Sequence, residues 1–343
     1  MTTLRTRRVT TARLTQQITE ARAEGEPVVL VHGNVSSSVF WHGTLTALPA
    51  PYRPIAVDLR GFGGTDPLPV DATRGLRDYA DDLAALLDAL GIERAHLVGW
   101  SMGGGVVLQY LRDRPAAVRS LTLVNPVSPY GFGGTHGVEG TLNAADGAGS
   151  GGGTANPDFV RLLADGDRGT GFPASPRTVL TSCYVKPPFT PAHGDEDAYV
   201  EAMLATRVGD DHYPGDSTPS DSWPGMAPGT RGVLNAMAPV HFRVDDLHLV
   251  DPKPPVLWIR GEDDIIVSDT SMFDLAHLGA IGAVPGWDGT PAQPMLAQTR
   301  HVLDRYAAAG GSVREVAVAG AGHAVHLERP EEFGKALLEV LSA

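Results

Sequence analysis

Residues 96–105 read HLVGWSMGGG, and this stretch joins two different kinds of secondary structure. A β-rich run, Ala95–Val98, leads into it, and a helical run follows it. The pattern Gly-x-Ser-x-Gly between a strand and a helix predicts a turn so tight that the residues beside the serine can have almost no side chain. Gly99 and Gly103 meet that requirement, and such a turn would hold the Ser101 hydroxyl above the sheet edge. The alternative is a glycine-rich turn whose serine merely caps the helix.

Strand and helix patterns alternate on both sides of this stretch. Continuous apolar runs, typical of strands buried on both faces of a parallel sheet, occur at Val28–Val31, Ile55–Val57 and Leu121–Val124. Apolar residues at helical spacing over Leu76–Leu90 predict an amphipathic helix that covers the sheet, with Asp78, Asp81 and Asp82 on its other side. A helix is also expected over residues 39–48, and a β-hairpin edge over Leu4–Ile18. The alternation predicts an α/β fold with a mostly parallel central sheet flanked by helices.

The regular alternation stops after Asn125 and resumes at Pro255. Beyond that point strands are expected at 256–260 and 313–318, and helices at 295–308 and 330–341. We therefore predict a core formed by residues 1–125 and 255–343, with an inserted cap domain at 126–254. Helices are expected within the cap at 157–165 and 195–206. The glycine-rich tract 147–153 has no strand before it and no Gly-Lys-Ser/Thr after it, which favours a flexible surface loop over a phosphate loop.

Composition limits the classes of partner and the compartment. The formal net charge of −13 argues against nucleic acid or an anionic membrane as the main partner. The single cysteine, Cys183, cannot form an internal disulfide, and a partly buried inert thiol is expected. The first twelve residues contain arginines but no apolar run, so neither a signal peptide nor membrane insertion is predicted. Cytoplasmic localisation is the expectation, and the oligomeric state stays open, a homo-oligomer included.

A serine hydroxyl needs an imidazole to accept its proton and an acid to orient that imidazole. Both residue types follow Ser101 in that order, each after a predicted strand: Asp264 in Gly-Glu-Asp-Asp and His323 in Gly-Ala-Gly-His. Asp263 and Glu262 are alternatives for the acid, and His326 is an alternative for the histidine. Asp210, Asp211 and His212 stand on a polar stretch and are interpreted as solvated rather than as metal ligands.

Five motifs in this order resemble the capped α/β-hydrolases, and the resemblance covers nearly all of the predicted core. The matching stretches are His-Gly at 32–33, Asp-x-Arg-Gly-x-Gly at 58–63, Gly-Trp-Ser-Met-Gly at 99–103, Gly-x-x-Asp at 261–264 and Gly-x-Gly-His at 320–323. The resemblance implies that Ser101 is the nucleophile, His323 the base and Asp264 the acid. It further implies that the N–H groups of Asn34 and Met102 form the oxyanion hole. His32 is expected to be a structural hydrogen-bonding residue, Asp58 and Arg60 to brace loops, and Trp100 either to pack or to touch substrate.

The predicted function is therefore that of a serine hydrolase that cleaves a carboxylic ester or lactone of a hydrophobic substrate through an acyl-enzyme, without metal or cofactor. The loop after His32 resembles haloalkane dehalogenases, but those enzymes have Asp where this chain has Ser101. The chain is also similar to bacterial esterases with perhydrolase activity and to actinobacterial lactone hydrolases, zearalenone-opening ones included. A C–C bond hydrolase and a perhydrolase would use the same triad, and a non-catalytic ligand receptor is the alternative of another class.

The predicted cap contains aromatic residues that bear on substrate choice, among them Phe132, Phe159, Phe172, Tyr184, Phe189, Tyr199 and Trp223. For most of them, packing inside the cap's own small core is the favoured interpretation. A cap of this length above a serine turn should nevertheless enclose a pocket with apolar walls and few polar groups. The expected substrate is therefore bulky and uncharged.

Overall fold

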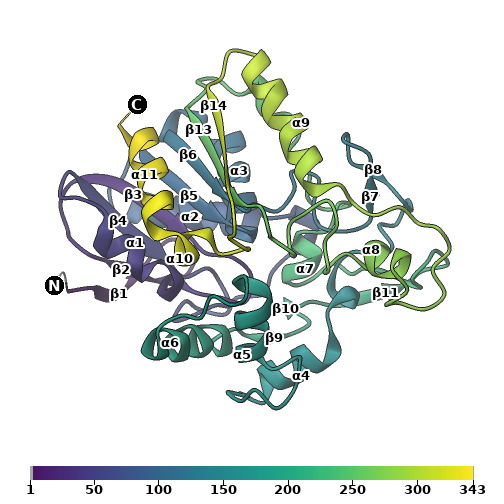
Figure 1. The fold of residues 1–343 in the computed structure, drawn as a ribbon. Coiled ribbons are helices and arrows are strands. Elements are labelled where there is room, and N and C mark those ends of the chain that lie inside the picture. The colour runs from purple at the N-terminus through teal and green to yellow at the C-terminus, as the bar shows by residue number, and fades with distance from the viewer. Residues whose placement is uncertain (1–2, 343) are drawn as a thin grey trace.

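The centre of the protein is one eight-stranded sheet, seen in a computed structural model that describes residues 3–342 (Figure 1). The order of the strands across the sheet is β1-β2-β4-β3-β5-β6-β13-β14. From β4 to β14 in that order neighbouring strands pair in parallel, and only β1 and β2 at one edge are antiparallel. The predicted α/β fold with a mostly parallel sheet is confirmed. The strands are β1 (Arg5–Thr10), β2 (Thr15–Glu20), β3 (Glu26–Val31), β4 (Tyr52–Val57), β5 (Ala95–Trp100), β6 (Val118–Val124), β13 (Val256–Gly261) and β14 (Val313–Val318).

Helices cover both faces of this sheet, because the strands between β3 and β13 are apolar on both sides. In Figure 1, α2 and α3 lie behind the sheet, whereas α1, α10 and α11 lie in front of it. The helix predicted over residues 39–48 begins with a 3₁₀ turn at Ser38–Trp41 and continues as α1. The helices of the core are α1 (His42–Ala47), α2 (Arg77–Ala89), α3 (Met102–Asp113), α8 (Leu275–Ala280), α9 (Met295–Ala308), α10 (Val325–Glu328) and α11 (Pro330–Leu341).

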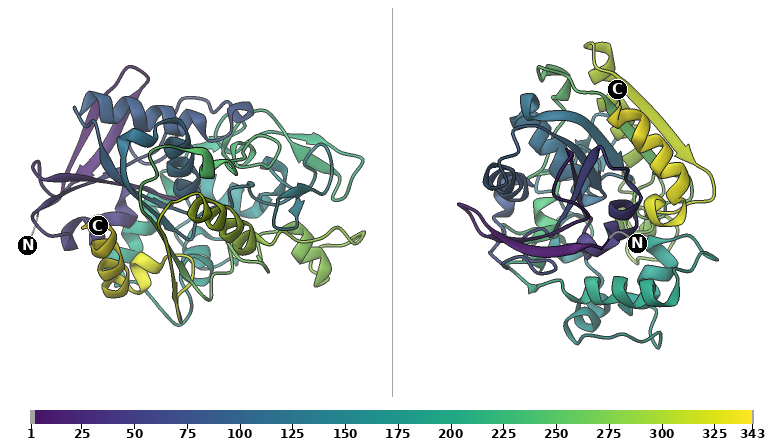
Figure 2. Two further views of the ribbon diagram at one scale, coloured as in Figure 1. Left: turned by 90° about the horizontal axis from the view of Figure 1, so that it is seen from above. Right: turned by 90° about the vertical axis from the view of Figure 1, so that its left-hand side faces the viewer.

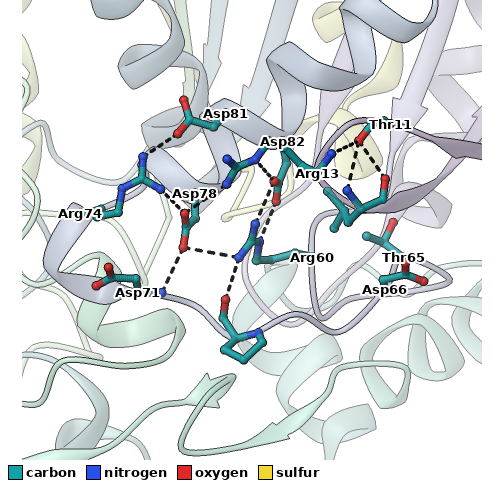
Figure 3. A network of polar contacts seen from close by, with 12 residues as sticks. Thr11, Arg13, Arg60, Thr65, Asp66, Asp71, Arg74, Asp78, Asp81 and Asp82 are labelled. Atoms are coloured by element: carbon teal, nitrogen blue, oxygen red, sulfur yellow. Dashed lines mark hydrogen bonds and ion pairs between the residues drawn. The ribbon is translucent and has the colours of Figure 1, made fainter.

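Helix α2 departs from its predicted amphipathic pattern. Asp82 is fully buried and Asp78 is 5% exposed, although both were expected on the outer side of the helix. Arg60, in the loop after β4, reaches under α2 and donates from Nε and Nη2 to both carboxylate oxygens of Asp82, at 2.7 and 2.9 Å (Figure 3). Arg13, from the turn of the β1–β2 hairpin, donates to the same carboxylate at 2.6 Å. The prediction was wrong for these two aspartates because their partners come from distant loops, which the spacing along one helix does not reveal.

The chain between β6 and β13, residues 126–254, contains α-helices of four to twelve residues and strands of two or three residues. In the left view of Figure 2 much of this segment lies at the right, away from both termini, whereas its helix α6 packs against the 3₁₀ turn before α1. Helices α4 and α6 lie close to the predicted positions. The elements are β7 (Thr135–His136), β8 (Thr141–Leu142), α4 (Pro157–Ala164), α5 (Pro176–Val179), α6 (His193–Leu204), β9 (Val208–Gly209), β10 (Tyr213–Pro214), β11 (Ser217–Pro219), β12 (Met226–Pro228) and α7 (Val233–Ala236).

The glycine-rich tract 147–153 is an interior part of this segment, so its prediction as a flexible surface loop was wrong. A Cβ atom on Gly152 would lie 2.4 Å from the carbonyl oxygen of Asp216, and one on Gly151 would lie 2.4 Å from Oδ1 of Asn235. The buried Asn235 also accepts a hydrogen bond of 2.7 Å from the Gly152 N–H. The glycines therefore allow close backbone packing, a role that a glycine-rich composition does not distinguish from flexibility.

Candidate active site

The turn between β5 and α3 has the geometry that its sequence predicts. Ser101 stands between the two elements with φ +55° and ψ −121°, a backbone conformation that L-residues with a side chain rarely adopt. A Cβ on Gly99 would lie 2.3 Å from the carbonyl oxygen of Gly103, and one on Gly103 would lie 2.4 Å from that of Val31. The Ser101 N–H donates to the Val124 carbonyl at 2.9 Å, which ties the strained residue to the neighbouring strand. Such strain persists where the surrounding structure holds it, and it clusters at functional sites.

The loop that follows β3 lies directly against the serine. An added Cβ on Gly33 would be 2.9 Å from the Ser101 Cβ, so the Gly33–Asn34 peptide runs beside the hydroxyl-bearing carbon. On the other side of the serine, Met102 is the first residue of α3, where main-chain N–H groups have no acceptor within the helix. Of the two predicted oxyanion donors, Met102 thus follows Ser101 directly in the chain, and the loop with Asn34 lies beside it in space.

The Gly33–Asn34 peptide is held in one orientation by two side chains. Its carbonyl oxygen, that of Gly33, is 2.7 Å from His32 Nδ1 and accepts a hydrogen bond of 2.8 Å from Ser36 Oγ. The His32 Nε2 accepts from the Leu59 N–H at 3.0 Å, so Nδ1 carries the proton. Burial lowers the pKa of His32, which keeps the ring neutral in this role. Because the peptide is trans, fixing its carbonyl also fixes the opposite direction of the Asn34 N–H.

His323 and Asp264 form a buried pair at the ends of the last two strands of the sheet. His323 Nδ1 lies 2.8 Å from Oδ2 of Asp264, and both side chains are at most 3% exposed. The other oxygen of Asp264 accepts from the main-chain N–H groups of Ile266 and Val267, at 2.7 and 3.1 Å. Asn125, directly after β6, donates from Nδ2 to Oδ2 at 2.7 Å. The carboxylate is therefore fixed on both oxygens, and its contact with Nδ1 leaves Nε2 of His323 available for the serine.

The structure separates the alternatives that the sequence left open. Asp263 lies in the same turn but forms an ion pair with Lys186, 2.7 Å between Oδ2 and Nζ, at the protein surface. Glu262 is exposed. Of these three acids, it is Asp264 that lies beside the imidazole.

His326 lies one turn beyond His323, in α10, and its ring packs on Trp41 with 4.2 Å between ring centroids and a tilt of 31°. Its complete burial lowers its pKa to about 3, so the ring stays neutral. Trp100 donates from Nε1 to the His323 carbonyl at 2.9 Å, which assigns it a packing and bracing role. The site thus contains one histidine against the acid and a second, neutral one in the supporting core.

Ser101, His323 and Asn34 open into one cavity of about 1180 Å³. Arg161 and Asp158 also line it, but the cavity is mainly apolar. Tyr213 of segment 126–254 contributes to its wall, together with five of the seven aromatic residues that the sequence analysis names: Phe132, Phe159, Phe172, Tyr184 and Trp223. The interpretation that most of these seven serve only the cap's own small core was therefore wrong.

A second wall of the cavity comes from residues 265–285, after β13, which the sequence analysis assigned no role in binding. Ile265, Met272 and Phe273 line the cavity and are 37–43% exposed, and Leu278 of α8 joins them. Their signal in the sequence is weak, since apolar residues scattered through a Gly- and Pro-containing connection match neither a strand nor a helix period. Exposed apolar side chains around one opening are nevertheless the kind of feature that marks a binding site.

Neither Cys183 nor the polar stretch around Asp211 forms a second site of its own. Cys183 lies in the cavity wall, half-buried, and burial raises the pKa of its thiol, which keeps it protonated. Asp211 forms a 2.7 Å ion pair with Arg231. Among residues 3–342, no three His, Cys, Asp or Glu side chains are grouped so that they could hold a metal ion. The same part of the chain contains no helix of the length and apolarity needed to span a bilayer.

Comparisons with known proteins agree with this architecture. Residues 26–143, which include the Asn34 loop and the Ser101 turn, match the family described as the α/β hydrolase fold. The esterase RhEst1 of Rhodococcus sp. superposes over 100% of this chain and 99% of its own, with a TM-score of 0.60 and 21% identity, which is a likeness of fold. The chain therefore has the α/β-hydrolase fold, and the match to the family model lies within residues 26–143.

Sequence relatives match a shorter part of the chain. A candidate carbamate hydrolase, RutD, of Variovorax paradoxus is 46% identical over 104 residues, which is 30% of this chain and 39% of that protein. An uncharacterized carboxylesterase, nap, of Bacillus subtilis is 31% identical over 116 residues, 34% of this chain and 38% of that protein. The chain thus matches about two fifths of the length of these relatives.

Proposed function

We propose that the protein is a serine hydrolase that cleaves a carboxylic ester or lactone of a hydrophobic substrate through an acyl-enzyme. The observation that carries the proposal is that a serine on a strained strand–helix turn opens into the same cavity as a histidine bound to a buried aspartate. The names of two relatives, a carboxylesterase and a carbamate hydrolase, support cleavage at an acyl carbon. A small-molecule substrate, a cytoplasmic location and chemistry without metal or cofactor belong to the same proposal.

In the first half-reaction, the Ser101 hydroxyl attacks the carbonyl carbon and its proton passes to Nε2 of His323. Asp264, held by four hydrogen-bond donors, keeps the imidazole in the tautomer that presents Nε2 and stabilises the imidazolium. The negative charge on the former carbonyl oxygen is stabilised by the N–H groups of Asn34 and Met102. When the bond to the leaving alcohol breaks, His323 returns the proton to that alcohol.

In the second half-reaction, water attacks the acyl carbon with His323 as base, and the carboxylic acid leaves as Ser101 recovers its proton. Segment 126–254 serves as a cap in this proposal, since it supplies one wall of the cavity above the serine. A largely apolar cavity of about 1180 Å³ favours a bulky, uncharged acyl compound over a short charged ester. A lactone keeps its leaving alcohol tethered near His323, so the cap releases a single product.

The nucleophile is tested with a fluorophosphonate probe and peptide mass spectrometry. The protein should be labelled once, at Ser101, and Ser101→Ala should abolish labelling and lower turnover of a nitrophenyl ester by a factor on the order of 10⁶. Ser312→Ala is the matched control, because Ser312 is an exposed serine directly before β14. Labelling that persists in Ser101→Ala would overturn the assignment, and a labelled protein that turns over no ester would point to a ligand receptor instead.

The substrate class is tested with pairs of hydrophobic lactones and linear esters of matched size and leaving-group acidity. We expect a higher kcat/KM on the lactone of each pair. If the linear esters are consistently faster, the lactone part of the proposal fails while the serine-hydrolase part stands.

A further inference from the structure

Tyr184 connects two of the active-site loops, although it belongs to segment 126–254. It ends a π-helical turn, Leu180–Tyr184, that directly follows α5. Its hydroxyl donates to the Asn34 carbonyl at 2.9 Å and lies 3.3 Å from the Val35 carbonyl oxygen. Its main-chain carbonyl accepts from the N–H of Ala324, the residue after His323, at 2.8 Å. One residue thus bridges the loop that carries an oxyanion donor and the loop that carries the base.

The next residues extend this bridge to the acid. The Lys186 N–H donates to Oε2 of Glu328 at 2.8 Å, and Oε1 of that buried glutamate accepts from the Gly322 N–H at 2.9 Å. The Lys186 ammonium pairs with Asp263, which precedes the catalytic acid. Residues 184–186, here called the strap, therefore contact the loops after β3, β13 and β14.

The hydroxyl of Tyr184 acts where the backbone is strained. Val35 has φ +46°, a conformation that is rare and costly for a β-branched residue. The carbonyls on either side of this residue, those of Asn34 and Val35, are the two that the phenol approaches. Burial raises the pKa of Tyr184, so the hydroxyl keeps its proton and remains a donor. Without it, the loop would lose the contact that best explains how the strained Val35 is retained.

We propose that Tyr184 is a positioning residue: its hydroxyl holds the strained Asn34–Val35 turn so that the Asn34 N–H faces the oxyanion that forms at Ser101. This inference rests on the proposed function. An oxyanion exists in the transition state and not in the bound substrate, so an error in the position of its donor lowers kcat and leaves substrate binding unchanged. The strap also gives segment 126–254 a part in the chemistry, beyond its part in the cavity wall.

The substitution Tyr184→Phe removes the hydroxyl and keeps the ring, which packs on Trp100 and His323 at 5.7 and 6.2 Å between centroids. Tyr306→Phe is the matched control, because the Tyr306 hydroxyl also donates to a main-chain carbonyl, that of Pro254 at 2.6 Å, and lies outside the cavity wall. We expect Tyr184→Phe to lower kcat by about tenfold with KM unchanged. Both variants lose one hydrogen bond to a main-chain carbonyl, so Tyr306→Phe should lower Tm by about as much as Tyr184→Phe does. Its kcat should equal that of wild type.

A second measurement isolates the oxyanion. A trifluoromethyl ketone adds to the serine as a charged hemiketal, whereas the matched secondary alcohol binds without forming an oxyanion. Tyr184→Phe should weaken inhibition by the ketone by about tenfold and leave inhibition by the alcohol unchanged. Equal loss for both inhibitors, or kcat equal to that of wild type, would overturn the positioning role. If Ser101→Ala is still labelled by the fluorophosphonate, the proposed function itself fails, so the two failures are distinguishable.

Discussion

The proposed catalytic edge of the sheet, which carries Ser101, Asp264 and His323 and is called the catalytic edge below, differs in construction from the wall of the cavity. At the edge, the side chains of Asp264, Asn125 and His323 are buried and joined by hydrogen bonds of 2.7 and 2.8 Å. In the wall, apolar side chains such as Phe172 and Phe273 are 56% and 40% exposed. The edge is specified by directional contacts, whereas the wall is specified by shape and apolar surface. Substitutions at the edge should therefore change the chemistry, and substitutions in the wall should change which substrates are accepted.

Backbone strain follows the same division. The non-glycine residues with left-handed φ in the described chain are Val35, Ser101 and Asn125, which follow β3, β5 and β6. In segment 126–254 the left-handed positions are occupied by glycine, which adopts them at little steric cost. Strain on residues that keep a side chain is retained only where neighbouring contacts hold it. This difference indicates that the backbone must be positioned accurately at the catalytic edge and less accurately in the wall.

After the loss of the nucleophile itself, the largest effect among residues of the edge should come from Asp264→Asn. A neutral amide at the orienting position can select the wrong imidazole tautomer, and in a serine protease the same change costs about 10⁴-fold in kcat. Steady-state kinetics with a nitrophenyl ester measures the loss. Asp263→Asn is the control, since Asp263 pairs with Lys186 at the surface, and its activity should change by less than about threefold. If Asp263→Asn lost its activity and Asp264→Asn kept it, the acid would be Asp263 and not Asp264.

A smaller and substrate-dependent effect is expected in the wall. Ala174→Phe places a ring in the cavity, so kcat/KM for a bulky hydrophobic lactone should fall about tenfold, while a short acetate ester is little affected. Ala145→Phe, at an exposed position outside the cavity wall, is the control. A uniform loss on both substrates would mean that the wall is coupled to the chemistry and would break the division described above.

The smallest effect is on stability and comes from the core behind the edge. The folded pKa of His326 is about 3, against an ordinary value of 6.5, because burial disfavours its charged form. The unfolded chain therefore binds a proton at this residue below pH 6.5 that the folded protein does not bind, and stability falls as pH drops from 6.5 towards 3. The contribution is at most about 1.4 kcal/mol per pH unit. Urea unfolding of wild type and His326→Phe between pH 7 and 5 measures it, and equal slopes would contradict it.

Much of the sheet and of the catalytic edge could be predicted from the sequence because both depend on local patterns. Apolar runs identified the parallel strands, and the ends of parallel strands meet at one edge whatever the loops between them contain. Gly99 and Gly103 report the tight turn at Ser101 directly, since a Cβ at either position would collide with a neighbouring main-chain oxygen. The motifs around Asp264 and His323 place them at strand ends, and the hydrogen bond between the two side chains is what the structure adds.

The remaining features were decided by contacts between distant parts of the chain. Asp78 and Asp82 became buried because Arg60 and Arg13 reach them from other loops, and the glycines at 151–152 became interior because Asp216 and Asn235 pack on them.

The wall of the cavity and the strap at Tyr184 belong to the same group of features. Neither follows a secondary-structure period. Apolar burial and hydrogen bonds to main-chain carbonyls require only that the residue lies close to its partner in the folded protein, and not that it has a particular spacing along the chain. Where a residue's role depends on its own spacing along the chain, the sequence alone determined it. Where the role depends on what lies opposite in space, only the tertiary structure did.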